Sequence, residues 1–323
     1  MPSRLTVQNF GRACRTALLW LVRAEARTLR LRGTDSLLRW LYHPDRRASD
    51  YLDFVGPYDD SLVQTDTRSF LEWWVYAYGG YATGSMQLLR RLVHPGSVVL
   101  DVGANIGLFT LPLARAAGET GVVHAFEPHP RLRARLVGNV ALNSLRNVTV
   151  SGLALGSRRC QATLWGSTTA NQGRGSLQPG PGLDEEFTCQ VDTLDWYVEA
   201  AALPRIDVIK IDTEGAELSV LVGGGAALQT FKPVLYLEAA PELLAKFGAT
   251  EGDVADFLRG LGYQLWGDAS NGKSPHLVPL ADGMSESVSP RNWLAVHPES
   301  VARTDLARAD RRSGDSLGVD AEP

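Results

Sequence analysis

Three acidic residues stand at or just past the ends of apolar segments that have the character of buried strands. They are Asp101, Asp212 and Glu238. If the segment before Asp212 lies between the other two in a parallel sheet, all three acids meet at the carboxyl edge. That edge is where open α/β sheets bind ligands. A carboxylate or a histidine can remove the proton from a hydroxyl, so we take Asp212 and Glu238 as candidate catalytic bases, with His129 as a third candidate.

Lys210 interrupts the apolar segment before Asp212, although a central parallel strand is expected to be almost wholly apolar. A buried lysine needs a carboxylate partner. A structural ion-pair network of Lys210, Asp212 and Glu238 is therefore an alternative to catalysis. Hard oxygen ligands also suit Mg²⁺, but we assign no metal-ligating residue.

A glycine-containing turn follows the segment that carries Asp101. Gly103, Asn105 and Gly107 occupy this turn. Dinucleotides require G-x-G-x-x-G, because the pyrophosphate contacts the backbone at the second glycine. Here Asn105 and Leu108 replace the second and third glycines. S-adenosylmethionine carries no phosphate: Asp101 suits its amino group directly or through water, and the turn amides suit its carboxylate. The alternative is a tight turn in which Asp101 only caps the helix.

Glu127 lies 20 residues past Gly107, in the sequence HAFEPHP at the end of the next expected strand. This is about the spacing at which an acid accepts hydrogen bonds from ribose hydroxyls. The alternative is a solvent-exposed glutamate at a strand end. Because NAD and S-adenosylmethionine both contain ribose, only the first turn discriminates between them, and it favours S-adenosylmethionine.

Alternating strands and helices predict an α/β fold: a mostly parallel seven-stranded sheet with helices on both faces. The expected strands are Val98–Val102, Val122–Phe126, Val148–Leu153, Asp207–Ile211, Val234–Glu238, Tyr263–Trp266 and Asn292–Val296. The expected helices are Leu108–Ala117, Pro130–Asn143, Ala216–Val222 and Thr250–Leu261. We expect a β-rich excursion over residues 160–191 and an antiparallel addition formed by the last two strands.

The sequence divides into three expected parts: an extension over residues 1–80, a catalytic domain over 81–298 and a disordered tail over 299–323. The extension begins with an Arg-rich amphipathic helix, which could contact a membrane surface or a protein partner, or pack on its own domain. Its second half is rich in aromatic residues and predicts a helix over Asp66–Tyr78. The oligomeric state is not predicted.

The composition of the chain argues against several classes of partner and site. The formal net charge of −4 argues against a nucleic-acid partner. The three cysteines show neither paired spacing nor a zinc pattern, which favours a reducing cytoplasm. No apolar stretch is long enough to span a membrane.

In several motifs the chain resembles the FkbM family of methyltransferases. The motifs are DVGANIGLFT (Asp101–Thr110), FEPHP (Phe126–Pro130) with Asn139 and Asn143, TLD (Thr193–Asp195), KIDTEGAE (Lys210–Glu217), the run Val220–Gly223 and PVLYLE (Pro233–Glu238). They fall in order over residues 81–297, about two thirds of the chain.

This resemblance implies a class I methyltransferase (Rossmann-like) fold, S-adenosylmethionine as cofactor and transfer of a methyl group to an oxygen. The implied acceptor is a small molecule or glycan, such as a sugar, a polyketide or another secondary metabolite. The residues that match the cofactor-binding motifs are Asp101, Gly103, Asn105, Gly107 and Glu127. Asn171 and Ser176 match a polar loop that could contact a ligand.

Two features depart from the family pattern, and the first is that the motifs do not cover residues 1–80. The residue after the third strand is Ala154 rather than an acid, so the residue that holds the adenine is not identified. The alternatives to a methyltransferase are an NAD-dependent oxidoreductase on a similar sheet and a non-catalytic domain that binds a partner through its Arg-rich helix.

Overall fold

A computed structural model describes Leu21 and residues 53–80, 82–167, 175–270, 275–280 and 290–300. The chain divides into two units, residues 1–81 with 167–174 and residues 82–166 with 175–323. Apart from Leu21, the predicted amphipathic helix lies outside the described residues. So do Asn171 and the predicted tail beyond Ser300.

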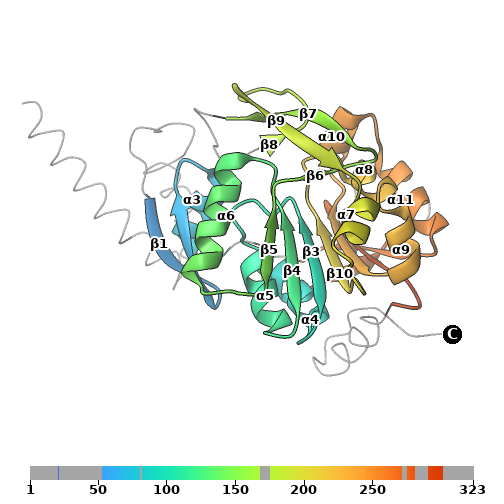
Figure 1. Cartoon of the computed structure of the whole chain (residues 1–323), viewed down its shortest axis with the longest axis horizontal. Coiled ribbons are helices and arrows are strands. Elements are labelled where there is room, and N and C mark those ends of the chain that lie inside the picture. Colours follow the sequence, from blue (N-terminus) through green and yellow to red (C-terminus); the bar gives the residue numbers. More distant parts are fainter. Residues whose placement is uncertain are drawn as a thin grey trace, which may run out of the picture. The chain divides into compact units, whose positions relative to one another are not determined.

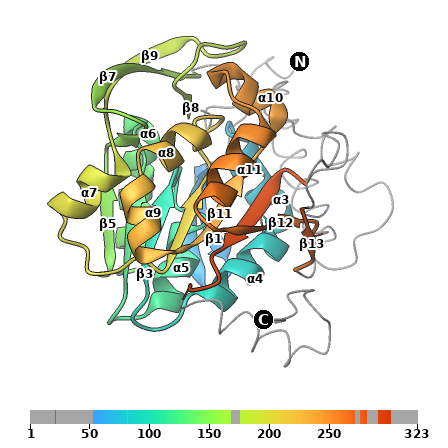
Figure 2. The ribbon, with the colours of Figure 1, turned by 90° about the vertical axis from the view of Figure 1, so that its right-hand side faces the viewer.

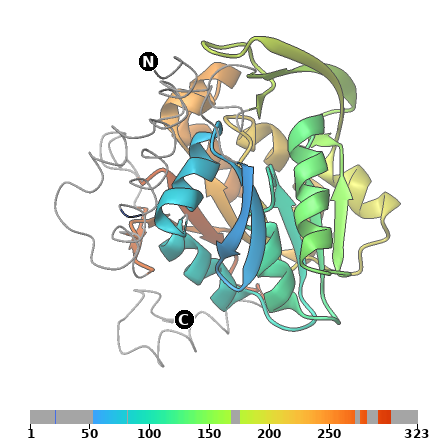
Figure 3. The same ribbon diagram turned by 90° about the vertical axis from the view of Figure 1, so that its left-hand side faces the viewer.

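In the first unit, a β-hairpin precedes a helix (Figure 3). Strands β1 (Asp53–Tyr58) and β2 (Ser61–Asp66) pair antiparallel across a two-residue turn. Helix α3 (Phe70–Tyr78) begins where the Ser69 side chain accepts a hydrogen bond from the backbone of Glu72. The sequence prediction of a helix from Asp66 was wrong at its start, because the residues of β2 alternate between the two faces of a strand.

The second unit is built on a sheet of eight strands. In spatial order they are β13 (Leu277–Pro279), β12 (Gln264–Asp268), β14 (Asn292–Val296), β11 (Val234–Glu238), β10 (Val208–Ile211), β3 (Val98–Val102), β4 (Val122–Phe126) and β5 (Val148–Ser151). Neighbouring strands from β5 to β11 are parallel, and β14 runs antiparallel between β11 and β12. This order, with one reversed strand inserted before β12, is the expected class I methyltransferase fold.

One detail of the predicted sheet was wrong, because the short strand β13 adds an eighth member at one edge. The antiparallel addition predicted for the last two strands is present: β14 pairs antiparallel with both β11 and β12. A three-residue strand is too short to show an alternating pattern in the sequence.

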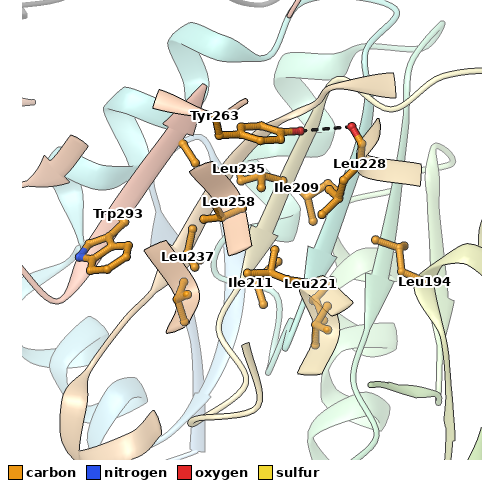
Figure 4. Packing of buried hydrophobic residues seen from close by; sticks show 14 of the residues in the cluster. Leu194, Ile209, Ile211, Leu221, Leu228, Leu235, Leu237, Leu258, Tyr263 and Trp293 are labelled. Carbon is orange, nitrogen blue, oxygen red and sulfur yellow. Dashed lines mark hydrogen bonds between the residues drawn. The ribbon is translucent and has the colours of Figure 1, made fainter. Parts of the chain in front are cut away.

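Helices cover both faces of this sheet (Figures 1 and 2). On one face lie α7 (Leu194–Ala200), α8 (Glu217–Val222), α9 (Gly225–Phe231) and α11 (Glu251–Gly260). Their apolar side chains pack on the strands in one large cluster, and the Tyr263 hydroxyl contacts the Leu228 carbonyl at its border (Figure 4). The other face carries α5 (Thr110–Ala117) and α6 (Pro130–Leu142), with α4 (Thr83–Leu92) against α5. A short helix, α10 (Pro241–Leu244), follows β11 and continues into a 3-10 turn, η2 (Ala245–Phe247).

The β-rich excursion predicted over residues 160–191 is a second, smaller sheet. Its strands are, in spatial order, β6 (Ala154–Leu155), β9 (Glu185–Asp192), β7 (Cys160–Gly166) and β8 (Gly175–Ser176). Leu164, Cys189 and Val191 form its apolar core. Ala154 is therefore a buried member of this sheet.

Candidate functional site

A row of in-register residues crosses the three central strands near their carboxyl ends. Asp101 on β3 pairs with Lys210 on β10, which pairs with Tyr236 on β11. Side chains in register on neighbouring strands point to the same face of a sheet. Here it is the face of α5, because the Thr110 hydroxyl on that helix donates to Asp101 Oδ2 at 2.6 Å. Strand β10 thus lies between β3 and β11, as the sequence analysis required.

Lys210 is buried and has acceptors on three sides. Its Nζ donates to the Gly103 carbonyl at 3.0 Å, and lies 3.4 Å from Asp101 Oδ1 and 3.5 Å from Asp212 Oδ2. Burial acts to lower the pKa of Lys210, but Asp212 and Asp101 outweigh it and raise the pKa well above its ordinary value. Lys210 is therefore a permanent cation. The ion-pair network expected from the sequence exists with Asp101 in place of Glu238.

Asp101 is fully buried beneath the turn that follows β3. Thr110 bonds one of its oxygens, and the other faces Lys210. The charged group that faces Asp101 is thus a cation of the protein itself. The Asp101 carboxylate has no accessible surface in this conformation. Asp101 could therefore act on a ligand amino group only through the electrostatic effect of its own negative charge.

The turn from Gly103 to Gly107, called here the cofactor turn, requires glycine at its first position. Gly103 has φ +77°, and a Cβ there would lie 1.8 Å from the carbonyl oxygen of Asp212. A positive φ disfavours any L-side chain, and the contact excludes even a methyl group. Asn105 also has a positive φ, of 52°, and its side-chain oxygen accepts a hydrogen bond from the backbone of Ile106. Asparagine tolerates this conformation better than most residues.

Glu127 extends from the end of β4 toward the cofactor turn. Its Oε2 accepts a hydrogen bond from the backbone N–H of Asn105 at 2.7 Å, and its Oε1 accepts one from the N–H of His129 at 2.8 Å. Burial raises the pKa of Glu127 to about 7, although both hydrogen bonds oppose the increase. Each carboxylate oxygen has two lone-pair sites, so each keeps one for a ligand hydroxyl.

The loop from Asp212 to Gly215, called here the Asp212 loop, is held from within by Glu217. Glu217 Oε1 accepts from the N–H of Thr213 at 2.7 Å and from that of Gly215 at 3.2 Å. A Cβ on Gly215 would lie 2.3 Å from the Leu243 carbonyl oxygen, so α10 fixes the other side of the loop. The Asp212 side chain remains 44% exposed. In the motif KIDTEGAE, the lysine, the glycine and the final glutamate thus fix a loop that presents Asp212 to solvent.

Glu238 ends β11 beside the Asp212 loop. Burial, and next the charge of Asp212, raise the pKa of Glu238 to about 7, against the influence of Arg291. Arg291 Nη2 lies 3.3 Å from Glu238 Oε1, and its guanidinium also pairs with Glu242. The charge of Asp212 at the end of β10 therefore influences the protonation of Glu238 at the end of β11. The sequence analysis did not identify Arg291, which lies outside every recognisable motif.

His129, the third catalytic candidate, is fully buried at the start of α6. Its ring packs against Phe187 with 4.7 Å between the ring centres, and a Cβ on Gly166 would lie 2.6 Å from its Nε2. Neither ring nitrogen has a hydrogen-bond partner within the described parts of the chain. Burial, and next the charge of Arg131, lower the pKa of His129 to about 4. A substrate hydroxyl cannot reach the buried ring in this conformation. Asp212 and Glu238 therefore remain the better candidates for the catalytic base.

The remaining expectations concern the polar loop and metal ligands. Ser176 is buried, and its hydroxyl accepts a hydrogen bond from the backbone of Gln178 at 3.1 Å. Within the described ranges, no group of three His, Cys, Asp or Glu side chains could hold a metal ion. None of the helices described is both long and apolar enough to cross a membrane.

The chain is similar to several characterised proteins. It is 31% identical over 252 residues to the AMB antimetabolite synthetase AmbE of Pseudomonas aeruginosa, a match that covers 64% of this chain and 12% of the relative. It is 33% identical over 159 residues to the 31-O-demethyl-FK506 methyltransferase FkbM of Streptomyces tacrolimicus, covering 41% and 60% of the two chains. It is 29% identical over 159 residues to the hexuronic acid methyltransferase AglP of Haloferax volcanii, covering 46% and 59%. The chain thus spans at most about three fifths of these relatives.

The family comparison covers the site directly. The model of the methyltransferase FkbM domain matches residues 101–265, just over half of the chain. The match begins at the buried aspartate beneath the cofactor turn. It includes Glu127, Lys210, the Asp212 loop and Glu238, and it ends within β12. The chain belongs to the FkbM methyltransferase family.

Proposed function

We propose that this protein is an S-adenosylmethionine-dependent methyltransferase that methylates a hydroxyl oxygen of a small-molecule or glycan acceptor. The observation that carries the proposal is the position of Glu127. It is a buried carboxylate whose two oxygens are anchored by backbone N–H groups, one of them on the cofactor turn. An acid so placed can accept hydrogen bonds from the two hydroxyls of a ribose.

The residues present fit the rest of this cofactor. Gly103 lets the cofactor turn pack against the Asp212 carbonyl, and Glu127 holds the backbone N–H of Asn105 in the same turn. Asn105 and Leu108 replace the glycines that a pyrophosphate needs, which disfavours the NAD-dependent alternative. Gly103, Asn105, Gly107 and Glu127 are the residues that we propose to hold the cofactor, with Asp101 supporting them from below.

When bound, S-adenosylmethionine supplies an electrophilic methyl group on a sulfonium centre. The chain's own contribution is to hold the acceptor hydroxyl in line with that methyl and to take its proton. Asp212 is the group proposed to take the proton, because it is exposed at the carboxyl edge while Lys210 contacts one of its oxygens. Glu238 lies close enough to Asp212 for the charge of Asp212 to help raise its pKa to about 7.

The class of acceptor is supported by the relatives. One acts on 31-O-demethyl-FK506 and another on a hexuronic acid. Both names point to small oxygen-bearing molecules, and the net charge of −4 does not favour nucleic acid. The non-catalytic alternative is disfavoured because Glu127, Lys210 and Asp212 are all present and form one connected site.

The cofactor is tested by titration calorimetry with S-adenosylmethionine, S-adenosylhomocysteine and NAD⁺. We expect both sulfur ligands to bind, and Glu127→Gln to weaken binding at pH 8 by at least tenfold, since a hydrogen bond to a charged group contributes about 1.5–3 kcal/mol. Glu186→Gln, which neutralises an exposed glutamate on β9, is the matched control and should leave affinity unchanged. Binding of NAD⁺ alone would overturn the proposal.

Methyl transfer is tested with methyl-labelled S-adenosylmethionine and a panel of glycosides, uronic acids and macrolactones. Asp212→Asn should reduce turnover by at least 100-fold on any accepted substrate, because general-base catalysis contributes about 10²–10⁴-fold. Its affinity for the cofactor should stay within about threefold, because Asp212 is not among the residues proposed to hold the cofactor. Turnover equal to wild type would exclude Asp212 as the base.

A further inference from the structure

One side chain contacts both halves of the proposed site. The buried Lys210 ammonium donates a hydrogen bond to the Gly103 carbonyl in the cofactor turn, and it forms ion pairs with the Asp101 and Asp212 carboxylates. The ring of Phe109 closes the remaining side, with its centre 5.2 Å from Nζ. Every group described around the ammonium thus belongs to the protein, and we take its role to be holding protein groups in place.

The two loops that Lys210 connects also touch directly. A Cβ on Gly103 would lie 1.8 Å from the carbonyl oxygen of Asp212, so the Gly103 backbone already lies against this oxygen. Close-packed groups transmit displacements rather than absorbing them. A shift of the cofactor turn on ligand binding must therefore move the Asp212 loop, or Lys210, or both.

We propose that Lys210 is a positioning residue that couples occupation of the cofactor turn to the orientation of the Asp212 carboxylate. This inference rests on the proposed function, since it assigns the turn to the cofactor and Asp212 to the acceptor. Its consequence is that a shift of the turn on cofactor binding changes where Lys210 holds the Asp212 carboxylate.

The contact with Asp212 is not needed to keep Lys210 buried. Asp101 has no accessible surface and already supplies a buried counter-charge 3.4 Å away. Asp212 is 44% exposed, and ion pairs with exposed partners add little to stability. The energetic effect of the Lys210–Asp212 contact therefore lies mainly in where it holds the carboxylate. Glu238, on the neighbouring strand, is not paired with Lys210 in the described structure and offers a comparison.

The composition of the chain makes the coupling directly observable. There are only four lysines: Lys210, Lys232, Lys246 and Lys273. Protein labelled with ¹³C at lysine Cε should give four signals, which single Lys→Met variants assign. We expect S-adenosylhomocysteine to shift the Lys210 signal and leave those of Lys232 and Lys246 in place. Asp212→Asn should shift the Lys210 signal without ligand, whereas Glu238→Gln should not.

A second measurement uses affinity. Lys210→Met alone would leave Asp101 buried without a counter-charge, and this could prevent folding. The substitution is therefore compared in an Asp101→Asn background. There we expect Lys210→Met to weaken S-adenosylhomocysteine binding by about tenfold, through the lost hydrogen bond to Gly103. Lys232→Met, which removes a surface ion pair with Glu299, is the matched control and should change affinity by less than twofold.

The outcomes separate the two proposals. If wild type does not bind S-adenosylhomocysteine in calorimetry, the proposed function fails. If it binds, but the Lys210 signal responds neither to the ligand nor to Asp212→Asn, the coupling is overturned and the cofactor assignment stands. A response to the ligand that survives unchanged in Asp212→Asn would show that Lys210 serves the turn alone, and this would also overturn the coupling.

Discussion

Glu127 should make cofactor affinity depend on pH. Burial raises its pKa to about 7 in the free protein, and ribose hydroxyls that donate to it favour its ionised form. If only the ionised form binds, the apparent Kd is multiplied by one plus the ratio of protonated to ionised Glu127. That factor is about 11 at pH 6 and about 1.1 at pH 8, so affinity for S-adenosylhomocysteine should rise about tenfold between these values.

Titration calorimetry measures this effect in two independent ways. The apparent Kd is determined from pH 6 to pH 8, and the heat at pH 7 is compared in buffers of different ionisation enthalpy. At pH 7 about half of the free molecules carry the proton, so binding should release roughly 0.5 proton. Glu127→Gln should abolish both the slope and the proton release, whereas Glu238→Gln should retain them although its carboxyl also has a pKa of about 7. An equal slope in Glu127→Gln would refute the assignment.

Three further predictions concern stability. The pKa of His129 is lowered by burial to about 4 from an ordinary 6.5, so the folded state should lose about 2 kcal/mol relative to the unfolded state as the pH falls from 7.5 to 5. His129→Leu should remove this loss in urea unfolding, and an unchanged difference between the two pH values would contradict the account. Gly103→Ala should lower the melting temperature and abolish cofactor binding, because its Cβ would overlap the Asp212 carbonyl. Gly138→Ala, on α6 with open space around its Cβ, should instead stabilise the fold by about 0.5–1 kcal/mol; a loss of stability there would mean that the helix is packed differently.

The central strands could be predicted because their signal is local. Four apolar residues and one aspartate, followed by a glycine turn, identify β3, and the helix after it follows from periodicity. The hairpin β1–β2 was missed because the alternation of its two short strands was overlooked, and the helix predicted over Asp66–Tyr78 begins only after it. The position of β14 depends on pairing between distant segments, which a local pattern does not contain.

The positions of the candidate acids on the strands could be predicted, but the contacts of their side chains could not. The carboxyl ends of β3, β4, β10 and β11 carry the expected acids. The partner of each acid depends on register, however: Lys210 stands beside Asp101 because β3 and β10 pair at those residues. The burial of His129 depends on the second sheet folding over it, and the pairing of Glu238 depends on Arg291 from a distant segment. Neither can be read from spacing along the chain.

The insertion of β14 between β11 and β12 has a consequence for biosynthesis. Among the described strands, β14 comes last in the chain, yet it separates two strands made before it. Until Asn292–Val296 leaves the ribosome, β11 has an unpaired edge beside the Asp212 loop, and β12 has no place in the sheet. Exposed strand edges promote association with other chains. A nascent chain that stalls before Asn292 would therefore present an open β-edge next to its unfinished active site, where a chaperone or a second nascent chain could pair with it.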